Sequence, residues 1–168
     1  MKKYKLTNET IEYKGKKLYR IKALIDFGNV EKGARGGFVE KEENLSMSGN
    51  AWVCGDALVC GDAFVYGTAK VYGAAKIYGD AKVHGAAQVC DDALVDKSIN
   101  YAVIKGFGTC CRPTTFFRCQ DKTVKVSCGC FLGTIDEFRN QVKNTRGGKI
   151  AKEYLMIADL MELHFFGG

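Results

Sequence analysis

Residues 51–86 read AWVCGD, ALVCGD, AFVYGT, AKVYGA, AKIYGD and AKVHGA, six consecutive hexapeptides with Ala first and Val or Ile third. Two more degenerate units at 87–92 and 93–98 keep the Ala and the Val, so the repeat covers 48 residues. A glycine usually stands two positions after the aliphatic residue. Such a strict short period is typical of architectures in which each unit stacks on the next.

Each hexapeptide predicts one short strand followed by a corner. The Ala and the aliphatic residue are two positions apart, so on an extended strand both point to the same face. The glycine relieves the backbone where the chain must bend, and the next residue is often a turn-tolerant one, such as Asp56 or Thr68. One small and one medium side chain per unit would therefore fill an interior.

This pattern closely resembles that of the hexapeptide-repeat proteins, which fold as a left-handed parallel β-helix with three units per coil. Their handedness is an exception to the usual right-handed crossover. The resemblance implies that residues 18 apart stack, with Val53, Val71 and Val89 in one internal column. We predict a mainly β protein, consisting of a left-handed parallel β-helix with an N-terminal β cap and a small C-terminal ββαα unit.

The outward positions of the repeat carry aromatic and cationic side chains. Exposed aromatic columns on a narrow prism are usually covered by another surface. In the family that the repeat resembles, this cover is commonly two further subunits, which implies a homotrimer; a C-terminal segment of the same chain is the alternative. The residues expected to bind partners or line interfaces are Trp52, Phe64, Tyr66, Lys70, Tyr72, Lys76, Tyr78, Lys82 and His84.

The chain divides into three parts on this interpretation, at 1–44, 45–104 and 105–168. Alternating apolar residues in 1–27 predict a β-hairpin or short meander, and 28–37 reads as a loop. An open β-helix end exposes unpaired backbone groups and aggregates unless it is covered. We therefore interpret the first part as a cap on the β-helix.

The third part has a different pattern, of strands followed by helices. Residues 114–118 and 123–127 read as two strands. Thr134 and Glu137 have the spacing of a capping box at the start of a first helix, and a second helix spans roughly 150–165. These elements make up the predicted ββαα unit.

Composition favours a cytoplasmic protein without a membrane span. The 168 residues are 46% hydrophobic and 26% charged, an ordinary globular balance. The start MKKYK has no apolar segment behind it, which predicts no secretory signal, and no run reaches the ~18 apolar residues of a membrane span. Eight cysteines without export signals indicate reduced thiols.

The net charge of +6 allows an anionic partner such as a nucleotide, a nucleic acid or acyl-CoA, although solubility explains it equally well. Lys70, Lys76 and Lys82 fall on successive faces of one coil. They would form a collar and not a stripe, so tracking along nucleic acid is not expected. Beside the neighbouring aromatic residues, these lysines would still suit a nucleotide at a subunit boundary.

The cysteines of the third part raise the alternative of structural zinc, because thiolates bind this metal tetrahedrally. The candidate ligands are Cys110, Cys119, Cys128 and Cys130. Their adjacent Cys-Cys and Cys-x-Cys spacings differ from those of the usual zinc knuckle. Buried thiols are therefore the favoured interpretation, a redox pair is a further alternative, and no cofactor is expected.

His84 is the alternative catalytic residue. Hexapeptide acyltransferases use a His as general base to deprotonate the acceptor, with acyl-CoA in a groove between subunits. Here the repeats run without the inserted loop that generally carries that His, so an interface role is favoured. The related β-helical carbonic anhydrases need three His ligands, and this chain has two His in total.

The lead-in to the repeats also has a resemblance of its own. Residues 36–46 read GGFVEKEENLS, similar to a segment that precedes such repeats in uncharacterised phage and prophage proteins. The resulting expectation is a non-enzymatic, trimeric β-helix scaffold of phage or prophage type, which binds a host protein or a nucleotide signal in a counter-defence role. The alternatives are an acyl-CoA-dependent acyltransferase and a structural virion or assembly protein.

Overall fold

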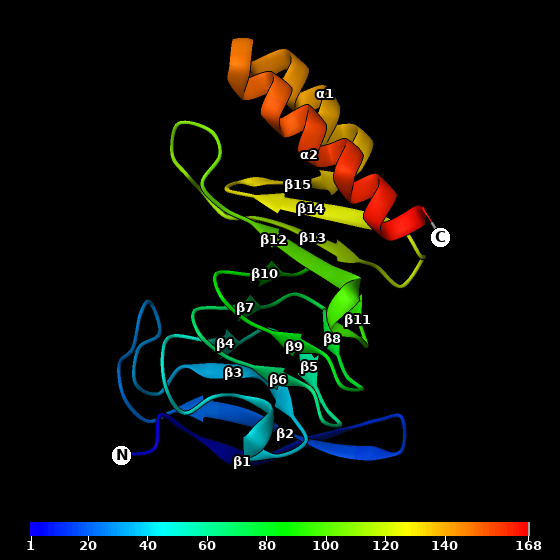
Figure 1. The fold of residues 1–168 in the computed structure, drawn as a ribbon. Coiled ribbons are helices and arrows are strands. Elements are labelled where there is room, and N and C mark those ends of the chain that lie inside the picture. Colours follow the sequence, from blue (N-terminus) through cyan, green and yellow to red (C-terminus); the bar gives the residue numbers. More distant parts are fainter. Residues whose placement is uncertain (168) are drawn as a thin grey trace.

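Eight short strands wind into a β-solenoid of about three turns, which forms the body of the molecule (Figure 1). This computed structural model describes residues 1–167. The strands stack in ladders that we call the first face (β4, β7 and β10), the second face (β5, β8 and β11) and the third face (β6 and β9). Their bounds, with those of two flanking 3-10 turns, are β4 (Trp52–Val53), β5 (Leu58–Val59), β6 (Phe64–Val65), β7 (Lys70–Val71), β8 (Lys76–Ile77), β9 (Lys82–Val83), β10 (Gln88–Val89), β11 (Leu94–Val95), η1 (Glu42–Asn44) and η2 (Ser98–Asn100).

Parallel pairing at a spacing of 18 residues holds the coils together. Val53 pairs with Val71, and Val71 pairs with Val89, as the repeat implied. Between these positions, the amide nitrogen of Trp52 donates to the carbonyl oxygen of Ala69 at 3.0 Å. The predicted stacking of one coil on the next is confirmed.

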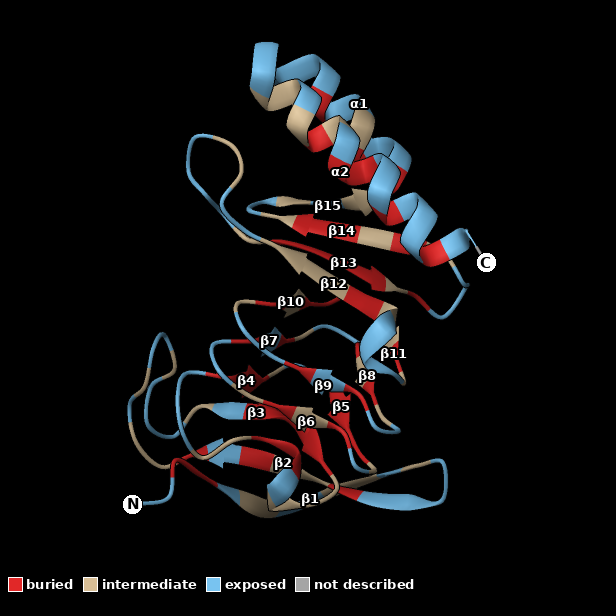
Figure 2. Ribbon diagram, in the orientation of Figure 1, coloured by how far each residue is buried: buried red, intermediate tan, exposed pale blue. Residues whose placement is uncertain are grey.

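The interior of the solenoid is filled by the alternating side chains of the repeat (Figure 2). Ala69, Val71, Ala75 and Ile77 are each 0% exposed. Full burial of a Val or Ile side chain contributes about 1.5–3 kcal/mol. This packed interior adds to the hydrogen bonds between the coils.

Glycine occupies the corners because the backbone there is left-handed. Gly73 and Gly85 have φ angles of +69° and +65°. A Cβ at Gly73 would lie 2.8 Å from the amide nitrogen of Asp91 on the following coil. Asp91 itself adopts φ +58° at the next corner, a conformation that Asp tolerates better than most residues.

The N-terminal hairpin joins the solenoid at the first coil. β1 (Tyr4–Tyr13) pairs antiparallel with β2 (Lys16–Ala23), and β2 pairs with β3 (Arg35–Val39), which is parallel to β5. The predicted hairpin is therefore present. The expected loop becomes strand from Arg35 onward because Gly36 allows close approach: a Cβ there would lie 2.7 Å from the ring of Trp52.

Three buried side chains donate to carbonyl groups of the first coil. Lys3 Nζ donates to the carbonyl oxygen of Ala51 at 3.0 Å, and Tyr4 Oη donates to that of Leu45 at 2.9 Å. Asn44 Nδ2 donates to a third carbonyl oxygen at 2.8 Å. A buried carbonyl without a donor costs about 1–3 kcal/mol, so these bonds stabilise the N-terminal end of the solenoid.

A four-stranded antiparallel sheet lies at the other end of the solenoid (Figure 1). In order, its strands are β12 (Tyr101–Ile104), β13 (Thr114–Arg118), β14 (Val124–Cys128) and β15 (Phe131–Thr134). β13 and β14 are the two predicted strands. The other two were not predicted, because β12 follows the repeats directly in sequence and Gly133 interrupts the strand-like pattern of β15.

The two predicted helices are present, and they pack on this sheet. α1 (Ile135–Thr145) begins with a capping box, in which Thr134 Oγ1 accepts from the amide nitrogen of Glu137 at 3.2 Å. α2 (Gly148–Phe166) buries Tyr154 and Ile157, while its outer surface is exposed (Figure 2). No helix within residues 1–167 has the length and apolarity that crossing a bilayer requires.

The sheet and the last coil are tied together by polar contacts. Lys125 Nζ donates to Asp91 Oδ2 at 2.5 Å and to Asp92 Oδ1 at 2.7 Å. These two carboxylates raise the pKa of the Lys125 amine. In addition, the amide nitrogen of Gln88 donates to Thr115 Oγ1 at 3.0 Å. The C-terminal unit is thus fixed directly to the solenoid.

Candidate binding surfaces

The first face is covered largely by its own chain. Trp52, an expected interface residue, is 5% exposed and packs edge-on against Phe27, with ring centroids 5.3 Å apart. Tyr72 is half-buried, and burial, together with the Cys90 thiol, raises its pKa to about 12. Lys70 remains exposed. The aromatic side chains of this face are therefore mostly engaged within the monomer.

The second face is covered at its start by the tip of the β1–β2 hairpin. Lys14 Nζ lies 3.5 Å from the ring centroid of Tyr78, and Tyr13 packs edge-on against the same ring at 6.4 Å. Lys76 Nζ donates to Gln120 Oε1 at 3.3 Å. Tyr78 and Lys76, both expected to meet partners, therefore have contacts within the chain.

The third face carries a row of stacked rings that faces solvent. The rings of Phe64 and Tyr66 stack with centroids 5.0 Å apart, and Tyr66 stacks in turn on His84 at 5.0 Å. Tyr101 meets His84 edge-on at 6.4 Å. We call Phe64, Tyr66, His84 and Tyr101 the aromatic ladder. His84 and the neighbouring Lys82 are exposed, and Phe64 and Tyr66 are half-exposed.

Backbone hydrogen bonds fix the Tyr101 end of the aromatic ladder. Tyr101 Oη donates to the carbonyl oxygen of Lys82 at 2.7 Å and accepts from the amide nitrogen of His84 at 3.3 Å. Phe64 and Tyr66 belong to one coil and His84 to the next, so the parallel pairing of β6 and β9 sets their separation. The Tyr101 ring, fixed in this way, has little freedom left to lose when a partner binds.

The three central lysines form a collar and not a stripe. Lys70, Lys76 and Lys82 begin β7, β8 and β9, which belong to three different ladders. The arrangement is the one that the repeat implied. It does not present a continuous positive track of the kind that follows a nucleic-acid backbone.

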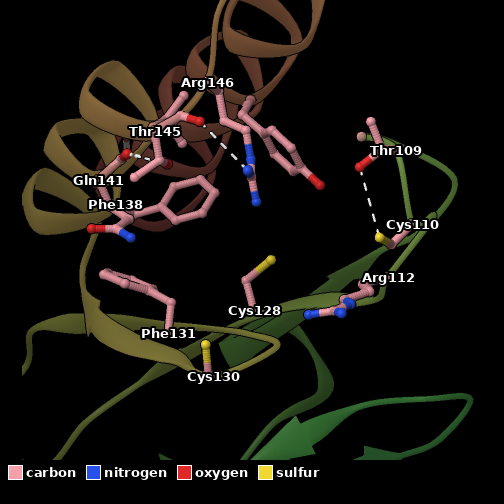
Figure 3. Close-up of a pocket in the computed structure, with 13 residues that line it drawn as sticks. Thr109, Cys110, Arg112, Cys128, Cys130, Phe131, Phe138, Gln141, Thr145 and Arg146 are labelled. Atoms are coloured by element: carbon pink, nitrogen blue, oxygen red, sulfur yellow. Dashed lines mark hydrogen bonds between the residues drawn. The ribbon is translucent and has the colours of Figure 1, made fainter.

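The four cysteines expected as alternative zinc ligands are not brought together. Cys110, Cys128 and Cys130 line a cavity beside the helices (Figure 3), whereas Cys119 lies past the opposite end of β13, against the last coil. Burial and the neighbouring Asp92 raise the pKa of Cys119 to about 12. Within residues 1–167, no three His, Cys, Asp or Glu side chains form a group suited to a metal ion.

His84 and His164, the two histidines, occupy separate places. His84 belongs to the aromatic ladder, and no inserted loop separates the repeat strands around it. His164 lies on α2, where its Nε2 is 3.1 Å from the carbonyl oxygen of Ile99. The sequence pointed to His84 but gave no indication that Arg112 and Arg146 would meet in one cavity.

Comparison of the sequence with models of protein families and with curated proteins gives no match.

Proposed function

We propose that this protein is a non-enzymatic binding scaffold that assembles as a homotrimer through the third face of its solenoid. The observation that carries this proposal is the aromatic ladder, in which exposed His84 continues a stack begun by Phe64 and Tyr66. Clustered aromatic side chains with few rotatable bonds are typical of protein interfaces.

The uneven cover of the three faces supports the choice of this surface. Trp52 on the first face and Tyr78 on the second are packed against segments of their own chain. The ladder on the third face is open by comparison, so a partner can reach it without displacing part of the monomer. Three copies arranged around a threefold axis would form a closed assembly.

In this proposal the solenoid is a left-handed β-helix and the N-terminal segment is its cap. The hexapeptide period supports the winding, because it matches the family that the sequence resembles. The hydrogen bonds from Lys3, Tyr4 and Asn44 to first-coil carbonyl groups support the cap. Such bonds leave fewer free groups at the end of the solenoid for pairing with another chain.

The wider role that we propose is that of a cytoplasmic phage or prophage protein that binds a host protein or a nucleotide signal in counter-defence. It is supported by the resemblance of residues 36–46 to the lead-in of phage hexapeptide-repeat proteins. The acyltransferase alternative requires His84 to act as a general base. The contacts of its imidazole with the rings of Tyr66 and Tyr101 are equally compatible with a role in an interface.

Charge substitutions at two exposed positions test the proposed assembly. His84→Glu introduces a carboxylate into the ladder, and Lys22→Gln changes the net charge by the same amount on the hairpin, where Lys22 is exposed. Light scattering after size exclusion should show trimers for the wild type and for Lys22→Gln, and monomers for folded His84→Glu. A His84→Glu variant that remains trimeric would refute an interface at the ladder.

A further inference from the structure

The C-terminal unit contains a cavity of about 290 Å³ (Figure 3). It is bounded by residues 108–112 of the loop between β12 and β13, the turn between β14 and β15, α1, and α2. Its size is near the lower end of the range for small-molecule sites, about 300–1,000 Å³. The cavity is separate from the aromatic ladder on the third face.

Two guanidinium groups reach this cavity from segments that are far apart in sequence. Arg112 belongs to the loop before β13, and Arg146 directly follows α1. Arg112 lies across the β14–β15 turn, where a Cβ on Gly129 would be 2.8 Å from its Nη1 atom. In Figure 3, both guanidinium groups point toward the interior of the cavity.

Among the residues that the structure describes, these two arginines have no carboxylate partner; Arg118 has none either, but its Nη2 donates to the carbonyl oxygen of Phe165 at 2.6 Å. Arg20, Arg35 and Arg139 each form ion pairs with Asp or Glu. No such pair is found for Arg112 or Arg146 within residues 1–167, and none of the described lining residues is acidic. Their charges are therefore available to an anion, and guanidinium groups bind phosphate particularly well.

Another part of the cavity wall is aromatic. Phe131 and Phe138 lie with ring centroids 5.6 Å apart, and Phe138 meets Tyr154 edge-on at 5.8 Å. Tyr154 Oη donates to the carbonyl oxygen of Phe107 at 3.2 Å, which fixes its ring. Burial raises the pKa of Tyr154, so this phenol keeps its proton at neutral pH. A flat ring would find a preformed apolar surface here.

We propose that this cavity binds a small phosphate monoester that carries a flat ring, with the phosphate near Arg112 and Arg146 and the ring against Phe131 and Phe138. Two unpaired cations suit the charge of a phosphate monoester, about −1.5 to −2 at neutral pH. The volume limits the enclosed part of the ligand to about the size of one mononucleotide.

Calorimetric titration with phenyl phosphate and with inorganic phosphate tests both halves of this site. Phenyl phosphate should bind the wild type at least about ten-fold more tightly than inorganic phosphate, because only the ester reaches the aromatic wall. Arg112→Gln and Arg146→Gln should each weaken phenyl phosphate binding by about 10- to 100-fold, since each removes a charge-assisted hydrogen bond.

Two further variants complete the experiment. Lys143→Gln removes one charge from an exposed position of α1 outside the cavity and should bind phenyl phosphate as the wild type does. Phe131→Ala should abolish the preference for the ester while inorganic phosphate still binds. The proposal is overturned if the wild type does not bind phenyl phosphate, or if the arginine variants bind it as Lys143→Gln does.

Discussion

The phenol ring of Tyr66 stacks on the imidazole of His84, with centroids 5.0 Å apart and an interplanar angle of 23°. The two residues stand 18 positions apart, one full coil of the solenoid. The same register that aligns the buried Val65 and Val83 therefore aligns the outward rings. A repeat that specifies a core in this way also specifies an ordered surface.

Replacement of His84 by Phe separates the interface role from the catalytic one. His84→Phe keeps a flat ring in the ladder, so we expect a folded trimer with the melting temperature changed by no more than a few degrees. If His84 were instead a general base, the substitution would remove any acetyl transfer from acetyl-CoA. Size exclusion and a thiol-release assay on wild type and variant distinguish these roles. Transfer by the wild type that disappears in His84→Phe would contradict the scaffold proposal.

Two corner glycines provide a matched test of coil stacking. Gly73 and Gly85 have nearly equal φ angles, +69° and +65°. A Cβ at Gly85 meets no atom within 4 Å, whereas one at Gly73 would lie 2.8 Å from the amide nitrogen of Asp91. Gly85→Ala should therefore lower the free energy of unfolding only by the strain of a left-handed Ala, about 1–2 kcal/mol. Gly73→Ala should lower the free energy of unfolding by about 1–3 kcal/mol more than Gly85→Ala does, because of the close contact.

Urea unfolding of both glycine variants measures this difference directly. Equal losses of unfolding free energy would show that the coils are not packed as closely at Gly73 as described.

The burial of Lys3 should make the free energy of unfolding depend on pH. Burial lowers the pKa of Lys3 from 10.5 to about 8. Between these values the unfolded chain binds more protons than the folded one, so this group makes the protein more stable as the pH rises from about 8 toward 10.5. Below about pH 8, the amine is charged in both states and the full cost of burying it is present.

The variant Lys3→Met removes this titration. Between about pH 7.5 and 9.5, the free energy of unfolding of the wild type should increase relative to that of Lys3→Met by on the order of 1–2 kcal/mol in total. Burial also raises the pKa of Tyr4, whose contribution to stability is lost above its unfolded value of 10.0. Burial also raises the pKa of thiols such as Cys60 and Cys119 above 9.0, which lowers stability over the same range in both proteins. The difference between the two profiles therefore reports Lys3, and parallel profiles would contradict the predicted effect.

The solenoid could be predicted from sequence because its information is local. Each hexapeptide contains the buried pair, the outward pair and the corner, as in Ala69 to Ala74. The capping box at Thr134 is local in the same sense, and it was found. Strand β12 was missed because its pairing partner, β13, follows a loop and has no repeat to indicate it.

The exterior was harder to predict because its environment depends on distant segments. Trp52 and Tyr66 occupy outward positions in the repeat, yet the loop that contains Phe27 buries the first and leaves the second half-exposed. Arg112 and Arg146 are 34 residues apart and share a cavity only after the helices pack on the sheet. Neither the burial of Trp52 nor the meeting of the two arginines can be inferred from neighbouring residues in the sequence.

Native mass spectrometry of the purified wild-type protein tests the central claim most directly. The proposed assembly predicts a species of three times the chain mass of 18.5 kDa, formed without added ligand. A species with the mass of one chain at micromolar concentration would contradict the proposed assembly, because the aromatic ladder would then not join copies of this chain.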